Sequence, residues 1–104
     1  MLKFRLIDEN TYKSYGFNLN MTEREFDDFI EYEIPNEYDE FIEKMETSGE
    51  SWSGVHDFDG EPNEVGYSSY EIEDFDTAIK MWFDFFKQYD KIDKDSVIII
   101  EDII

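Results

Sequence analysis

The strongest constraint on the fold is a broad apolar stripe in the last helix that the sequence predicts. Between Asp76 and Asp90, apolar side chains recur at helical spacing and cover more than one face. A surface helix needs a single apolar face, so a stripe this wide predicts a core helix that is packed on two sides. We expect Asp76 to cap this helix. The stripe consists of Ala78, Ile79, Met81, Trp82, Phe83, Phe85, Phe86 and Tyr89.

The chain has enough apolar material for one compact core. It has 104 residues, of which 18% are aromatic, and each aromatic side chain can bury ~150–250 Å². A net charge of −19 favours disorder, but disordered chains are poor in aromatic and β-branched residues. We therefore expect a single folded domain over residues 1–104.

Two strands are predicted at the start of the chain. Residues 2–7 alternate between apolar and basic side chains, which indicates a half-buried strand, and residues 15–19 alternate between large apolar side chains and Gly or Asn. The two strands can pair antiparallel. In the first, Leu2, Phe4 and Leu6 share one face, and Lys3 and Arg5 share the other.

Two short acidic helices follow. Thr22 and Glu25 form a capping box, which predicts a helix from about Glu23 to Tyr32 that ends before Pro35. Asn36 is expected to cap the second helix, which should end at residues 47–49. Its apolar face consists of Tyr38, Phe41, Ile42 and Met45.

The remaining strands complete the predicted fold. Residues 51–58 and 65–72 indicate a hairpin with an acidic tip, and residues 96–100 form an almost continuous β-branched run. Such a run is typical of an internal strand covered on both faces. The order of elements predicts an α+β domain. Its mixed or antiparallel sheet of about five strands would pack against the C-terminal amphipathic helix, with the two short acidic helices beside it.

Acidic residues are concentrated in the middle of the chain. Residues 23–76 hold 20 of the 28 acidic residues but only two bases, Arg24 and Lys44. The net charge of −19 is well beyond the ~2–8 charges that keep a small domain soluble. It repels nucleic acids and anionic membranes, and it attracts basic surfaces. A compositional bias of a whole acidic proteome is the alternative explanation.

The predicted acidic helices carry like charges at unfavourable spacing. Asp27 and Glu31 are four residues apart, as are Asp39 and Glu43. Each such pair destabilises a helix by ~0.2–0.5 kcal/mol. A surface selected for stability alone would place a base at one position of each pair, so the pattern suggests that binding selects the charge.

No catalytic motif stands out, and we expect neither an enzyme nor a cofactor. The chain has no cysteine and one histidine, His56, so a zinc site lacks its usual ligands. Several serines could serve as a nucleophile and none is singled out, and there is no glycine-rich phosphate loop. The Asp57–Glu64 loop is rich in carboxylates that could hold a divalent metal, so a small metal-dependent enzyme remains an alternative.

The charge pattern favours a cytoplasmic binding protein that docks on a basic, nucleic-acid-binding surface of another protein. In size and charge the chain resembles DNA mimics that block restriction or CRISPR enzymes, and immunity proteins that neutralise nuclease toxins. We expect a monomer that binds neither nucleic acid nor membrane directly. A self-associating structural module is a further alternative. The predicted partner-binding residues are Glu37, Asp39, Glu40, Glu43, Glu46, Trp52, Asp57, Asp59, Glu61, Glu64, Tyr67, Glu71 and Glu73.

Overall fold

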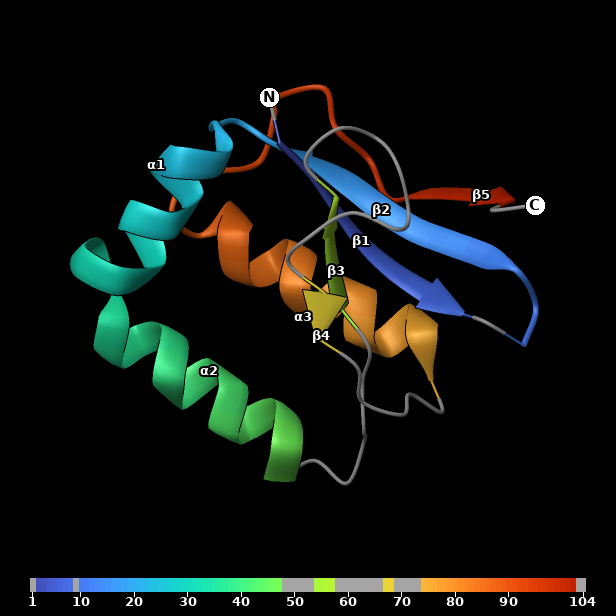
Figure 1. Ribbon diagram of the computed structural model, residues 1–104, viewed down its shortest axis with the longest axis horizontal. Coiled ribbons are helices and arrows are strands. Elements are labelled where there is room, and N and C mark those ends of the chain that lie inside the picture. The colour runs from blue at the N-terminus through green and yellow to red at the C-terminus, as the bar shows by residue number, and fades with distance from the viewer. Residues whose placement is uncertain (1, 9, 48–53, 58–66, 69–73, 103–104) are drawn as a thin grey trace.

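The computed structural model describes residues 2–8, 10–47, 54–57, 67–68 and 74–102, and the side chains of 2–8, 10–45 and 74–102. It confirms the α+β class. The strand pairs among the described residues are all antiparallel, and the sheet order is β4-β3-β1-β2-β5. Figure 1 shows helix α3 against this sheet and helix α2 on the far side of α3.

Strands β1 (Leu2–Asp8) and β2 (Lys13–Leu19) form the predicted hairpin. Phe4 lies opposite Phe17, and their rings stack at 5.0 Å between centroids. Arg5 lies on the face opposite Phe4, as predicted, but its side chain is buried there. Strand β1 lies between β2 and β3, and the Arg5 stem covers Gly16, the residue opposite it on β2.

Strands β3 (Gly54–Asp57) and β4 (Tyr67–Ser68) pair with each other, and β3 also pairs with β1. They are short parts of the two strands predicted in residues 51–72. The predicted acidic tip of that hairpin lies outside the described residues.

Strand β5 (Ile99–Asp102) corrects the prediction of an internal strand. It pairs only with β2 among the described strands and lies at one end of the sheet order. Val97 and Ile100 are 65% and 55% exposed, so this β-branched run is not covered on both faces. A hydrophobic run alone does not distinguish an edge strand from an internal one, since strand order is set by the whole topology.

The first helical segment begins where the sequence predicts. Both hydrogen bonds of the capping box between Thr22 and Glu25 are present at the start of α1 (Glu23–Asp28). The helix continues as a π-helical turn, η1 (Phe29–Glu33), in which the Ile34 amide donates to the Phe29 carbonyl at 3.0 Å. The wider turn ends just before Pro35, which has no amide hydrogen with which to continue the helix.

Helix α2 (Pro35–Thr47) begins one residue before the predicted cap, so Asn36 lies inside its first turn. Proline is favoured at the first helical position because the amide it lacks would have no partner there. Helix α2 leaves η1 in a new direction, as Figure 1 shows.

Helix α3 (Phe75–Lys87) is the centre of the core. Its cap is Asp74 and not Asp76, because the Asp74 carboxylate accepts from the Thr77 amide at 3.1 Å. Trp82 is fully buried, with its ring 4.8 Å from Phe4 of the sheet and 4.7 Å from Phe41 of α2. The aromatic stripe therefore contacts both the sheet and α2.

Candidate functional site

The candidate site is the helical segment from Glu23 to Met45, here called the acidic arm. It comprises α1, η1 and most of α2, and every carboxylate on it is exposed. Its two bases, Arg24 and Lys44, leave it with a net charge of −8. The ten carboxylates are Glu23, Glu25, Asp27, Asp28, Glu31, Glu33, Glu37, Asp39, Glu40 and Glu43.

The other described side chains are close to electrical balance. Outside the acidic arm they include nine carboxylates and seven bases, a net charge of −2. Two of those bases, Lys3 and Arg5, lie 3.2 and 3.7 Å from the same Glu101 carboxylate oxygen. The described charge is therefore concentrated on one part of the molecule. The remaining nine carboxylates of the sequence belong to residues 9 and 46–73, whose side chains are not described.

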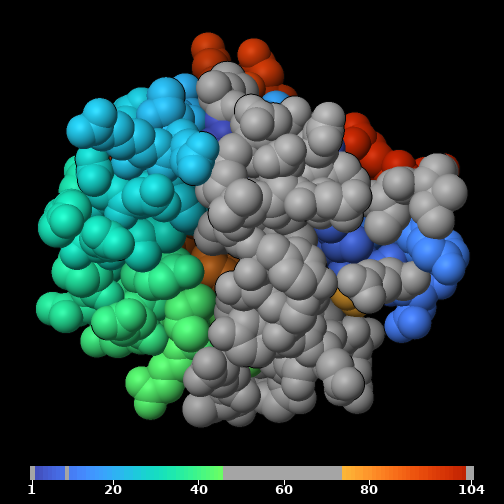
Figure 2. All heavy atoms as spheres, viewed as in Figure 1, coloured from blue at the N-terminus to red at the C-terminus, as the bar shows by residue number. Residues whose placement is uncertain are grey.

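Apolar residues on the inner face fix how the acidic arm is presented. Phe26 and Phe29 are buried, and the Phe29 ring lies edge-on to Tyr89 at 5.5 Å. Phe41 stacks on Phe85 of α3 at 4.3 Å. Because these rings hold one side of the arm against α3, its polar residues face outward. Figure 2 shows the arm, in cyan to green, as a continuous strip along one side of the molecule.

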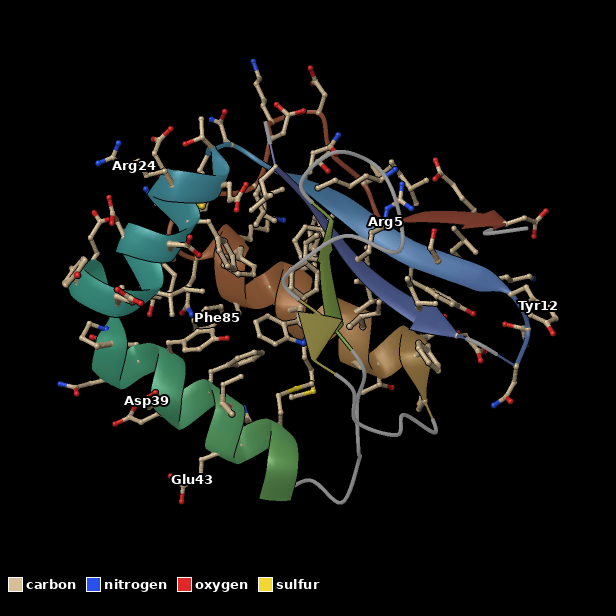
Figure 3. All side chains as sticks on the ribbon, viewed as in Figure 1. Arg5, Tyr12, Arg24, Asp39, Glu43 and Phe85 are labelled. Atoms are coloured by element: carbon tan, nitrogen blue, oxygen red, sulfur yellow. The ribbon has the colours of Figure 1, made fainter. Side chains whose placement is uncertain are left out.

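Four predicted partner-binding residues lie on α2 and are exposed: Glu37, Asp39, Glu40 and Glu43. Asp39 and Glu43 point away from the core (Figure 3). Glu37 and Glu40 lie near Tyr89 at the end of α3. The pKa of Tyr89 is raised, first because burial disfavours the phenolate and then because these two carboxylates repel it.

Three further predicted residues have a described backbone. Glu46 lies in the last turn of α2, Asp57 at the end of β3 and Tyr67 at the start of β4. The other predicted residues lie outside the described part of the chain: Trp52, Asp59, Glu61, Glu64, Glu71 and Glu73.

One aromatic residue of the acidic arm was missed by the sequence reasoning. Tyr32 in η1 is 74% exposed and stands between Glu31 and Glu33. Tyr32 lies outside the apolar stripe formed by Phe26, Phe29 and Ile30. A helical projection of the sequence therefore places it on the solvent-facing side of the helix. Exposed tyrosines are frequent anchors of protein interfaces.

Tyr38, which the sequence places on the apolar face of the second helix, packs on the core as expected. Its ring lies 6.2 Å from both Trp82 and Phe85, and the residue is half-buried. Its position on the apolar face of α2, together with Phe41, explains this placement.

The metal alternative gains no support from the described residues. No group of three or more His, Cys, Asp or Glu side chains in the described ranges is placed to hold a metal ion. The Asp57–Glu64 loop, on which that alternative rests, lies almost wholly outside those ranges.

Comparison with known proteins assigns no family to this fold and surface. No family model, curated protein or solved structure matches the chain. Within the described residues, no helix has the length and apolar character needed to cross a bilayer.

Proposed function

We propose that this chain is a small acidic binding protein whose acidic arm docks on a basic, nucleic-acid-binding surface of a partner protein. It would act as a DNA mimic of the kind found among anti-CRISPR, anti-restriction and nuclease-toxin immunity proteins. The partner is a basic protein, and the chain performs no chemistry of its own.

The uneven distribution of charge is the observation that carries this proposal. A coat of carboxylates that served only solubility would spread over the surface. Instead the acidic arm has a net charge of −8, whereas the other described side chains together have −2. A field of one sign on one surface attracts a basic partner and raises the rate of encounter.

The arrangement within the acidic arm also suits a phosphate-like surface. Side chains four residues apart on a helix lie ~5–6 Å from each other. Asp39 and Glu43 have this spacing on α2 and both point outward. Phosphates on one DNA strand follow each other every ~3.4 Å of helix rise. Carboxylates on successive turns can therefore meet Lys and Arg side chains that otherwise contact a DNA backbone.

Tyr32 gives the acidic arm an aromatic contact that the sequence reasoning did not include. A tyrosine ring beside Glu31 and Glu33 can stack on an arginine guanidinium while the carboxylates accept its hydrogen bonds. Arginine is the base most used for phosphate recognition, so the same side chains of a partner could bind either DNA or this surface.

The proposal is tested by capture of partners from an extract of the source organism. The bait is the wild-type chain or the double variant Glu40→Lys/Glu43→Lys. A matched control, Asp84→Lys/Asp95→Lys, changes the net charge equally at exposed positions outside the acidic arm. We expect the arm variant to lose the partner, mainly through a slower association rate, and the control to retain it.

Two further measurements on the captured partner decide the mechanism. Double-stranded DNA should displace the chain, because both would occupy one basic surface. The affinity should also fall steeply as salt is raised. An affinity that is equal at low and high salt, or a partner that binds DNA and this chain at once, would contradict the proposal.

A further inference from the structure

The outer edge of β5 is a second surface with an unusual character. The described residues include five large exposed apolar side chains, and three of them are Ile100 of β5 and Val97 and Ile98, which lie just before that strand. Their exposed fractions are 65%, 36% and 55%. β5 ends the sheet order, so no described strand pairs with its outer side.

Residues 96–100, which lead into β5 and form its first half, lack the usual protection against strand pairing. Natural edge strands carry lysine, proline, bulges or inward-pointing charges. Residues 96–100 contain no charge and no proline. Glu101 lies opposite Ser14 on the sheet face that also carries Lys3 and Arg5, and its carboxylate contacts both of those bases. The Glu101 carboxylate is thus held over the sheet face, the other acidic residue of β5, Asp102, lies opposite Lys13 on β2, and the apolar run stays accessible.

The distribution of charge selects a second copy of this chain as the occupant. A chain of net charge −19 repels its copy at most approaches. Around β5, however, Lys3, Arg5 and Lys13 offset Glu101 and Asp102. The acidic arm lies at the opposite end of the molecule from β5, as Figure 1 shows. Two copies joined at β5 would therefore keep their acidic arms far apart.

We propose that two copies form a dimer by antiparallel pairing of their β5 edges. A two-fold axis would place one apolar run opposite the other and make one continuous sheet, and it would leave neither β5 edge open. A basic strand of another protein fits less well, because Glu101 already has two basic neighbours. The paired segment is short, and interfaces of small area are weak, so the dimer should dissociate on dilution.

This dimer is independent of the docking proposed for the acidic arm, and the two respond to salt in opposite directions. Docking on a basic partner weakens as salt is raised. Pairing of two acidic copies strengthens, because screening reduces their mutual repulsion. If docking or dimerisation were absent, the salt dependence of the other interaction could still be measured.

Sedimentation equilibrium of the full chain over about two decades of concentration tests the dimer. We expect the wild-type mass to rise from monomer to dimer, at lower concentration in high salt. Ile100→Lys and Val97→Lys each change an exposed side chain, so both should fold. Each should weaken association by about tenfold or more, since a charge on an edge opposes pairing. Tyr32→Lys adds the same charge to the acidic arm and should dimerise as wild type does.

Hydrogen exchange locates the interface. In the wild type, amide protection in residues 97–102 should increase with protein concentration, and in Ile100→Lys it should not. A chain that remains a monomer at every concentration and salt would overturn the proposal. So would a dimer that neither the Ile100 nor the Val97 variant weakens, because its interface would lie elsewhere.

Discussion

At the scale of single residues, Phe41 connects the acidic arm to the core. Its ring stacks on Phe85 at 4.3 Å and lies edge-on to Trp82 at 4.7 Å. Trp82 in turn contacts Phe4 of β1 at 4.8 Å. A short chain of aromatic contacts thus runs from α2 through α3 to the sheet, and such pairs are favourable beyond the area they bury.

Replacement of Phe41 by alanine should destabilise the fold and loosen α2. Truncation of a buried Phe costs ~3–5 kcal/mol, and Phe41 is half-buried, so we expect about 2–3 kcal/mol. Urea unfolding followed by tryptophan fluorescence measures this loss. Phe41→Leu keeps much of the volume and should lose about half as much. A Phe41→Ala variant as stable as wild type would show that this contact does not hold the acidic arm in place.

At the scale of elements, the start of α3 shows how one packing contact decides a boundary. Asp74 and Asp76 both precede apolar residues at helical spacing, and the sequence favoured Asp76. In the structure, Phe75 is the first helical residue and stacks on Tyr15 of β2 at 5.5 Å. This contact joins distant parts of the chain. Helix α3 accordingly has its cap at Asp74, two residues before the cap that the sequence predicted.

The Asp74 cap makes a specific prediction for pH. Hydrogen bonds from the Thr77 hydroxyl and amide lower the pKa of Asp74. A lowered pKa means that its contribution to stability is full above the unfolded value, about 3.9, and is lost as the pH falls through the folded pKa. Asp74→Ala should therefore be less stable than wild type at neutral pH, and urea midpoints should show the difference shrinking in acid.

Asp74→Asn is the control for the pH effect. Asparagine keeps a capping oxygen but does not titrate, so this variant should retain most of the stability at neutral pH. Its difference from Asp74→Ala should not change with pH. An Asp74→Ala difference that is equal at neutral and acidic pH would contradict the role of the ionised cap.

The elements that the sequence predicted well are those fixed by local patterns. Alternation in residues 2–7 and the Thr22 capping box both depend on neighbours within a few positions, and both are confirmed. Two features that the local sequence did not specify concern tertiary relations. Arg5 is buried because β1 has a strand on each side, and β5 is exposed because the topology places it at an edge.

The candidate site likewise has features that the local sequence indicates and features that it does not. Charge and helical spacing correctly indicated that Glu37, Asp39, Glu40 and Glu43 are exposed on one helix. Tyr32 was not predicted as a binding residue, although its position outside the Phe26, Phe29 and Ile30 stripe of a regular helix already indicates an exposed side chain. The π-helical turn around Tyr32, closed by the Ile34 amide on the Phe29 carbonyl, is not specified by a pattern of apolar residues.

At the scale of the whole molecule, the acidic arm and the β5 edge lie at opposite ends (Figure 1). One end carries most of the described charge, and the other carries most of the strongly exposed apolar surface. The two surfaces favour different kinds of contact, one electrostatic and one apolar with backbone pairing. A dimer through β5 would display two acidic arms, so a partner with two basic sites would gain from binding both.

We expect the clustered carboxylates of the acidic arm to lower the stability of the fold while they favour docking, and Glu43→Lys tests this. Asp39 repels Glu43 one turn away, whereas lysine at position 43 would attract Asp39, in the favourable order along the helix. Removal of the repulsion and gain of the attraction together should stabilise the fold by about 0.4–1 kcal/mol at low salt. The gain should shrink at high salt, and urea unfolding at two salt concentrations measures it. Glu43→Gln removes only the repulsion and should give about half of the gain. If Glu43→Lys both stabilised the chain and bound the partner as tightly as wild type, the repulsion retained at this position would serve no docking function.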